Sequence, residues 1–105
     1  MQRGDVVELR PPKGVGREQN GKRLGVIVQS DALLPRSVVL VAPTSTSARS
    51  ATVRPIVTID GLQTKVLVEQ MAAVDVNRLG ETITSLAGED MWNIDDALKL
   101  VLGLY

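Results

Sequence analysis

The 105-residue chain contains no cysteine and no histidine, and these two absences exclude several kinds of active site. Without cysteine it can form no disulfide, no thiol nucleophile and no thiolate metal site. Without histidine it lacks the commonest general acid–base and the commonest metal ligand. Acid–base chemistry would therefore fall to Glu, Asp, Lys, Arg or Tyr side chains.

Aromatic residues and net charge are also scarce. Phenylalanine is absent, and Trp92 and Tyr105 are the only aromatic residues, so the chain offers little surface on which bases could stack. We expect Trp92 to lie in the core or in an interface. The twelve basic and twelve acidic residues cancel, which argues against a basic surface over the whole protein. Residues 1–54, however, carry nine basic and four acidic side chains, and this excess of +5 predicts a local basic face.

Long apolar stretches are missing as well. The chain has no run of eighteen apolar residues and no apolar signal-peptide core, so the sequence predicts neither a membrane span nor export. The absence of cysteine agrees with a cytoplasmic protein. The length and the hydrophobic content of 44% predict one folded domain that covers residues 1–105.

Short apolar runs between turn residues predict a mostly β fold. The expected strands are residues 5–10, 24–29, 37–42, 53–60, 65–74 (as one strand or two) and 80–86. Pro43 should close the third strand, and Asp60-Gly61 should form the turn after the fourth. Asp75 should cap a short helical turn.

A single amphipathic helix is expected at the C-terminus, over about residues 89–104. Apolar residues recur there at spacings of three and four, namely Met91, Ile94, Leu98, Val101 and Tyr105. Several short strands and one terminal helix imply a compact, mostly antiparallel β-barrel or β-sandwich.

A loop rich in glycine and charge, residues 14–23, leads without a spacer into an apolar strand. Arg23 is the last charged residue before that strand, and Glu18 and Lys22 are near it in sequence. One interpretation is an exposed ion pair between Arg23 and Glu18, which would contribute little to stability. The other is that the Arg23 guanidinium binds a phosphate in bidentate fashion, with Glu18 as a general base or as the residue that orients Arg23. The glycines match neither the dinucleotide-binding nor the P-loop pattern.

Residues 43–47, PTSTS, group four hydroxyl side chains at the end of the third expected strand. Such a cluster can cap a strand end through local hydrogen bonds, which is common. It can also supply donors to phosphate oxygens. The residue types alone leave both interpretations open.

Taken together, the order of these motifs resembles the MazF/PemK toxins of bacterial toxin–antitoxin modules. The resemblance is carried by RGDVV at 3–7, GREQNGKR at 16–23, VAPTSTS at 41–47, LVEQMAAVDVNRLGETITSL at 67–86 and DDALKLVLGLY at the end of the chain. The G-x-E-Q-x-G-x-R element within residues 16–23 is its most specific part.

The resemblance implies a small SH3-like (CcdB/PemK-type) β-barrel with a C-terminal α-helix. It also implies a homodimer that cuts single-stranded RNA, including mRNA, at short sequence motifs without a metal or any other cofactor. A homodimer would further help to bury the apolar residues of 67–74 and of the helix. The expected protein partner is a cognate, MazE-like antitoxin with an acidic tail that is disordered when free.

Site residues follow from the same resemblance. Arg23 and Glu18 fall on the family's catalytic Arg and Glu. The family's catalytic hydroxyl falls on Ser45, or on Thr44 or Thr46 if the register differs by one residue. Substrate binding is expected from Gln19, Lys22, Thr44 and Thr46.

The mechanism we expect is attack by the RNA 2′-hydroxyl on the adjacent phosphorus, which leaves a 2′,3′-cyclic phosphate and a 5′-hydroxyl. This route suits a chain without histidine, because the substrate supplies the nucleophile. The alternatives are a non-enzymatic, CcdB-like toxin that binds gyrase, and a plain binding module with a basic docking face. Replacement of Arg23 by alanine separates the three, since only the ribonuclease depends on that guanidinium.

Overall fold

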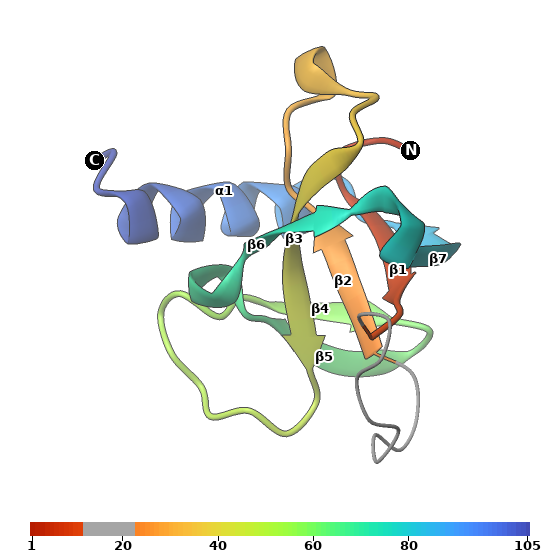
Figure 1. The fold of residues 1–105 in the computed structure, drawn as a ribbon. Helices are drawn as coiled ribbons and strands as arrows, with labels where there is room; N and C mark the ends of the chain where they lie inside the picture. The colour runs from red at the N-terminus through yellow and green to blue at the C-terminus, as the bar shows by residue number, and fades with distance from the viewer. Residues whose placement is uncertain (12–22) are drawn as a thin grey trace.

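The computed structural model describes residues 1–11 and 23–105. In this part of the chain, seven strands are followed by one helix (Figure 1). The strands are β1 (Asp5–Leu9), β2 (Arg23–Ile27), β3 (Val38–Ser45), β4 (Ile56–Ile59), β5 (Leu62–Val66), β6 (Ala72–Asp75) and β7 (Leu79–Ser85), and the helix is α1 (Glu89–Leu102). Three single 3-10 turns lie between them, η1 (Asp31–Leu33), η2 (Val68–Gln70) and η3 (Val76–Arg78). No helix in the described ranges is long and apolar enough to cross a membrane.

The strands form one antiparallel sheet in the order β4-β5-β3-β2-β1-β7, and β6 pairs with the first half of β3. The sheet curls into a half-barrel with the C-terminal helix packed against it (Figure 1). The predicted mostly β fold with a C-terminal helix is therefore confirmed. The central strand is β3, which pairs with β2 as well as with β6 and then β5.

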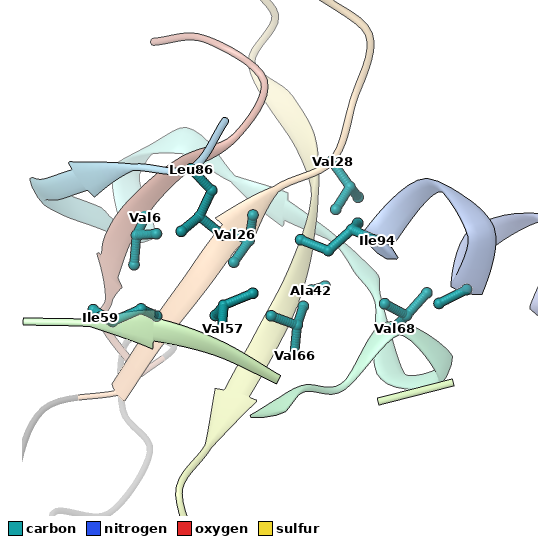
Figure 2. Close-up of a cluster of buried hydrophobic side chains, with 11 residues drawn as sticks. Val6, Val26, Val28, Ala42, Val57, Ile59, Val66, Val68, Leu86 and Ile94 are labelled. Carbon is teal, nitrogen blue, oxygen red and sulfur yellow. The ribbon is translucent and has the colours of Figure 1, made fainter. Parts of the chain in front are cut away.

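Two clusters of buried side chains lie on the two faces of the curled sheet, because side chains alternate between faces along each strand. Val6 and Val26 are cross-strand partners in the first cluster, which Ile94 of α1 completes (Figure 2). Val7 and Ile27, the next residues along, belong to the second cluster. Full burial of each such aliphatic side chain stabilises the fold by roughly 1.5–3 kcal/mol.

Most of the predicted stripe of the helix packs against the first cluster, where Met91, Leu98 and Val101 are partly buried. Ile94 and Ala97 are buried, whereas Trp92 is 68% exposed and Tyr105 is 90% exposed. Tyr105 fails to join the stripe because α1 ends at Leu102, and Gly103 then turns the chain with a left-handed φ of 70°. Placement of Trp92 in the core was therefore wrong, and its role in an interface stays a prediction.

The third strand does not close at Pro43 but continues to Ser45. Proline cannot donate to a ladder, and it is tolerated here because of where β3 changes partners. The pairing with β6 ends at Val41, and the pairing with β5 begins at Thr44. Pro43 has no amide hydrogen to donate, but its carbonyl still accepts a hydrogen bond from the Leu67 amide at 2.8 Å.

Other local predictions are confirmed. Asp60-Gly61 joins β4 to β5 as a two-residue turn with positive φ at both positions, 50° and 77°, as a type I′ hairpin requires. Residues 65–74 split into two strands around η2. The Asp75 carboxylate caps η3 by accepting from the Asn77 amide at 2.8 Å.

The Arg3-Gly4-Asp5 sequence has a structural role in this fold. Arg3 Nη2 forms an ion pair with Asp95 Oδ1 of α1 at 2.6 Å. Gly4 has a φ of 94°, and an added Cβ would lie 2.7 Å from the backbone oxygen of Leu86. The buried Asp5 carboxylate accepts from Ser85 Oγ at 2.6 Å. These contacts fasten the start of the chain to α1 and β7.

Gly25 of β2 should not tolerate a larger side chain, because a Cβ there would lie 2.5 Å from Val41 Cγ1 and 2.9 Å from Leu9 Cδ1. We expect Gly25→Ala to lower the free energy of unfolding by about 1–3 kcal/mol through overpacking. Urea denaturation followed by circular dichroism measures this loss. Val41→Ala should lower the free energy of unfolding less in the Gly25→Ala variant than in the unmodified chain, since it removes the methyl groups that clash with the added Cβ. Additive losses, or an unchanged unfolding free energy for Gly25→Ala, would contradict the packing argument.

Candidate functional site

Arg23 and Ser45 meet at one end of the sheet. β1 and β3 end there and β2 begins there (Figure 1). Gly25 pairs with Pro43, so the same antiparallel register, carried two residues further, places Arg23 beside Ser45. On its other side Arg23 pairs with Leu9. The structure thus brings together two of the residues that the sequence singles out.

Two adjoining hollows open at this end of the sheet, and Arg23, Leu24, Thr44 and Ser45 line both. The first has a volume of about 320 Å³ and extends toward β1, η2 and η3. The second has a volume of about 500 Å³ and extends along the β4–β5 hairpin. Arg23 and Ser45 therefore stand at the junction of one continuous groove.

Side-chain alternation separates Ser45 from Thr44. A Cβ on Gly25 would contact Leu9 and Val41, which places the odd-numbered residues of β2 on the face of the second cluster. Side chains alternate with a period of two, so Arg23 falls on the same face as Gly25. Pro43 is the partner of Gly25 on β3 and shares its face, so Ser45, two positions further along, falls on that face too. Thr44 falls on the opposite face.

Hydrogen bonds distinguish the three candidate hydroxyl groups further. Thr44 Oγ1 donates to the Leu24 carbonyl at 3.2 Å, so its proton is already used. Ser45 Oγ accepts from the Ser47 and Ala48 amides at 3.2 and 3.0 Å. Its oxygen is held in place, and among the described residues its own proton has no acceptor. Thr46 is exposed, with no hydrogen bond to its hydroxyl in the described ranges. Ser45 is thus the best-positioned donor toward a ligand.

Two further arginines, Arg10 and Arg78, line the first hollow together with Arg23. Arg78 Nε donates to the Arg10 carbonyl at 2.9 Å, and the Arg10 amide donates to the Arg78 carbonyl at 2.7 Å. Sequence analysis missed both, because they are 68 residues apart and meet only through the pairing of β1 with β7. Gln70 of η2, which also lines this hollow, was missed too.

The charge of the first hollow is of one sign in the described part of the chain. Three guanidinium groups line it, and no carboxylate does. A concave surface with one sign of charge concentrates ions of the opposite sign. Arg10 and Arg23 come from the basic half of the sequence, residues 1–54, whereas Arg78 comes from outside it. The arrangement favours an anionic ligand.

Three predicted site residues, Glu18, Gln19 and Lys22, lie outside the described residues. Within the described ranges Arg23 is exposed and makes no ion pair. No group of three or more acidic side chains there is arranged to hold a metal ion.

An ion pair fastens the loop after β3 beside the groove. Arg54 Nη2 contacts Glu69 Oε2 of η2 at 2.7 Å, and Arg54 Nη1 donates to the Arg49 carbonyl at 3.0 Å. The hydrogen bond from Arg54 lowers the pKa of the Glu69 carboxyl, and the same bond raises the pKa of Arg54. Gln70, the residue after Glu69, lines the first hollow. The ion pair therefore links the loop after β3 to the wall of that hollow.

Comparison with known proteins shows the family to which the chain belongs. Residues 2–102 match the family model described as PemK-like, MazF-like toxin of type II toxin–antitoxin system. The chain is 34% identical over 114 residues to the endoribonuclease MazF of Staphylococcus saprophyticus, an alignment that covers 100% of this chain and 93% of the relative. It is 37% identical over 90 residues to a Mycobacterium tuberculosis protein named as a candidate toxin, covering 85% of this chain and 84% of that protein.

Solved structures share the fold. An endoribonuclease in complex with its cognate antitoxin, from a mycobacterial species, superposes with a TM-score of 0.79 at 21% identity, covering 100% of this chain and 97% of that one. MazF from Deinococcus radiodurans superposes with a TM-score of 0.75 at 18% identity, covering 98% and 96%.

The ion pair between Arg54 and Glu69 should make stability depend on pH. Because Arg54 lowers the folded-state pKa of Glu69 below its ordinary value of 4.5, the pair stabilises the fold above that pH. The stabilisation is lost as the pH falls through the lowered pKa. We expect the melting temperature of the unmodified chain to exceed that of Glu69→Gln near neutral pH, with the difference shrinking in acid.

Thermal melts across this pH range measure the difference. Glu81→Gln removes the same charge from an exposed residue of β7 and controls for net charge. A difference between the unmodified chain and Glu69→Gln that stays constant from neutral to acid pH would contradict the assignment.

Proposed function

This chain belongs to the PemK-like, MazF-like toxins of type II toxin–antitoxin systems, and from that premise we propose that it is a sequence-specific endoribonuclease of single-stranded RNA. The observation that carries the proposal is the junction of the groove. There Arg23 and a hydroxyl donor, Ser45, line one hollow whose described charges are all positive, and the register of β2 with β3 makes them neighbours. RNA is a polyanion, so its backbone matches this groove in charge.

The chemistry we propose uses the substrate's own nucleophile. The RNA 2′-oxygen forms a bond to the adjacent phosphorus as its proton passes to a base, which is Glu18 or, if Glu18 only orients Arg23, a water molecule. The bond from phosphorus to the 5′-oxygen breaks. The products are a 2′,3′-cyclic phosphate and a 5′-hydroxyl. A chain without histidine and cysteine can perform this reaction, because the substrate supplies the nucleophile and Arg, Glu and hydroxyl side chains can position the phosphate, stabilise charge and transfer protons.

Each described site residue has a defined task in this scheme. Arg23 stabilises the negative charge that develops on the phosphate oxygens and protonates the leaving 5′-oxygen. Ser45 donates its hydroxyl proton to a non-bridging oxygen, since its Oγ is already fixed by two backbone amides. Glu18, outside the described residues, remains the proposed base or the residue that orients Arg23.

Substrate contacts are proposed for residues around the junction. Thr46 is exposed on the wall of the second hollow, where its hydroxyl can reach RNA. Thr44 lines both hollows and can still accept a hydrogen bond through its oxygen. Gln19 and Lys22, both outside the described residues, complete the proposed set.

The partners we propose are an antitoxin and a second copy of the chain. An acidic antitoxin tail would match the positive groove in charge. The mycobacterial endoribonuclease was solved in complex with its cognate antitoxin, and a structure from Deinococcus radiodurans contains MazE with MazF. One argument for a homodimer was wrong, because Leu67, Val68 and Val74 are buried within a single chain. The support that remains is the set of exposed apolar side chains on α1 and β4, namely Trp92, Leu100, Leu102 and Ile56.

Cleavage of a long, weakly structured RNA in EDTA tests the function directly. We expect discrete cuts, mapped by primer extension, that Arg23→Ala abolishes. Ser45→Ala should lower the cleavage rate by about 10²–10³-fold, as loss of a charge-stabilising donor does. Thr44→Val should have a smaller effect, because its proton is committed to Leu24. Arg36→Ala, which removes an exposed arginine of the β2–β3 connection, is the matched control.

Two outcomes would overturn this assignment. Cuts that persist unchanged in Arg23→Ala would remove the proposed catalytic group. The absence of any cut by the folded protein would favour the non-enzymatic alternative, a toxin that binds gyrase.

The proposed nucleophile has its own test. An oligonucleotide with a single 2′-deoxyribose on the 5′ side of the mapped scissile bond should resist cleavage, because no 2′-oxygen is present to attack. The same oligonucleotide with the deoxyribose placed at a remote nucleotide should be cut at the normal rate. Gel analysis of the two substrates side by side decides the matter, and equal cleavage would exclude this mechanism.

A further inference from the structure

We propose that Arg10 and Arg78 bind the RNA phosphate next to the scissile one, in the first hollow. This inference rests on the proposed function, since it assumes that Arg23 and Ser45 hold the scissile phosphate at the junction. Every nucleotide of the strand carries a phosphate. A scissile phosphate inside a strand therefore has one neighbouring phosphate on each side, and the question is which of the two hollows is built to bind one of them.

The two arginines are prepared for an anion before it arrives. Arg78 is half-buried, and its Nε is tied to the Arg10 carbonyl at 2.9 Å. The return bond from the Arg10 amide to the Arg78 carbonyl, at 2.7 Å, and the neighbouring pair of Leu9 with Leu79 hold the two segments together. The terminal nitrogens of Arg78 remain as donors in a fixed orientation. Less conformational freedom is then lost when a phosphate binds.

Charge supports a ligand at this position. Neither Arg10 nor Arg78 forms an ion pair with a carboxylate in the described part of the chain. Glu8 Oε1 and Arg10 Nε both lie close to Gly80, so this carboxylate offsets part of the repulsion among the three guanidinium groups, although it does not line the hollow. The repulsion that remains needs a compensating gain. A bound phosphate supplies that gain through charge-assisted hydrogen bonds.

The second hollow is the poorer place for this neighbouring phosphate. Asp60 lines it, and its carboxylate would repel a phosphate. The remaining polar side chains of that hollow, apart from Arg23, are the uncharged hydroxyls of residues 44–47 and 64. The contrast assigns the neighbouring phosphate to the side of Arg10 and Arg78.

Binding of this phosphate would set the position of the strand along the groove without taking part in bond breaking. Loss of either arginine should therefore weaken binding more than it slows the chemical step at saturating RNA. It should also reduce the dependence of binding on salt, because fewer counterions are released when fewer phosphates are contacted.

The test measures binding by fluorescence anisotropy at several salt concentrations. The probe is a short single-stranded oligonucleotide with 2′-deoxyribose throughout, which keeps every phosphate and cannot be cut by the proposed route. Arg10→Ala is the sharpest variant, because it leaves intact the carbonyl and the amide that bond to Arg78. Arg36→Ala is the matched control, since Arg36 also donates its Nε to a backbone carbonyl, that of Leu33, and lies outside both hollows.

We expect Arg10→Ala and Arg78→Ala each to weaken binding by roughly tenfold or more. Each should reduce the slope of log K against log salt by about 0.7, the value for one contact to a single strand. Arg36→Ala should change neither quantity. Arg78→Lys should keep most of the slope but lose affinity, because a lysine cannot reproduce the bond to the Arg10 carbonyl together with the terminal donors.

If both alanine variants gave the same slope of log K against log salt as the unmodified chain, the proposed phosphate site at Arg10 and Arg78 would be wrong. A loss of single-turnover rate at saturating RNA without a loss of affinity would also overturn it. Failure of the proposed function looks different. In that case the unmodified chain would bind the probe, and the arginine variants would bind it less well, but RNA would not be cut.

Discussion

The pairing of β2 with β1 on one edge and β3 on the other is the constraint on which the rest of the site depends. It places Leu9, Arg23 and Ser45 side by side at one end of the sheet, although the chain connects them through long intervening segments. Close approach of these strands requires a glycine at position 25, since any side chain there would meet Leu9 and Val41. The packing of the second cluster and the position of Arg23 therefore depend on the same backbone contact.

The groove combines rigid and adaptable parts. Arg78 and Ser45 are fixed by backbone hydrogen bonds, whereas Arg10 and Thr46 are exposed. Groups that stabilise a transition state are most effective when they are already oriented. Groups that only guide a flexible polymer need less order. Ser45, at the junction, is of the first kind, and Thr46, on the wall of the second hollow, is of the second kind. Arg78 is fixed as well, which suits a residue that holds the strand at one position along the groove.

Local patterns in the sequence were sufficient for most of the fold. The turn at Asp60-Gly61, the cap by Asp75 and the buried stripe around Ile94 each depend on residues close in sequence, and each is found. The end of β3 was misplaced, since a proline normally interrupts a strand and its tolerance here depends on which strands lie on either side. Exposure of Trp92 likewise depends on tertiary packing, which the helical period does not include.

The candidate site was only partly accessible from the sequence. Arg23 and Ser45 were indicated by resemblance to a family, and the register of β2 with β3 then separated Ser45 from Thr44. Arg10 and Arg78 were given no role by that resemblance, although Arg78 lies within residues 67–86, which carry part of it. Each is an isolated arginine in an ordinary sequence context, and only the β1–β7 pairing across the fold brings them together.

The missing amide hydrogen of Pro43 has a consequence for the precision of this site. β6 pairs with β3 before Pro43 and β5 pairs with it beyond, so the residue without a donor coincides with the gap between the two partner strands. A slip of either strand by one position would move a ladder bond onto the proline, where none can form. The imino acid therefore opposes sliding of β5 and β6 along β3. It thereby holds η2, which connects these two strands, and keeps Gln70 at the wall of the first hollow.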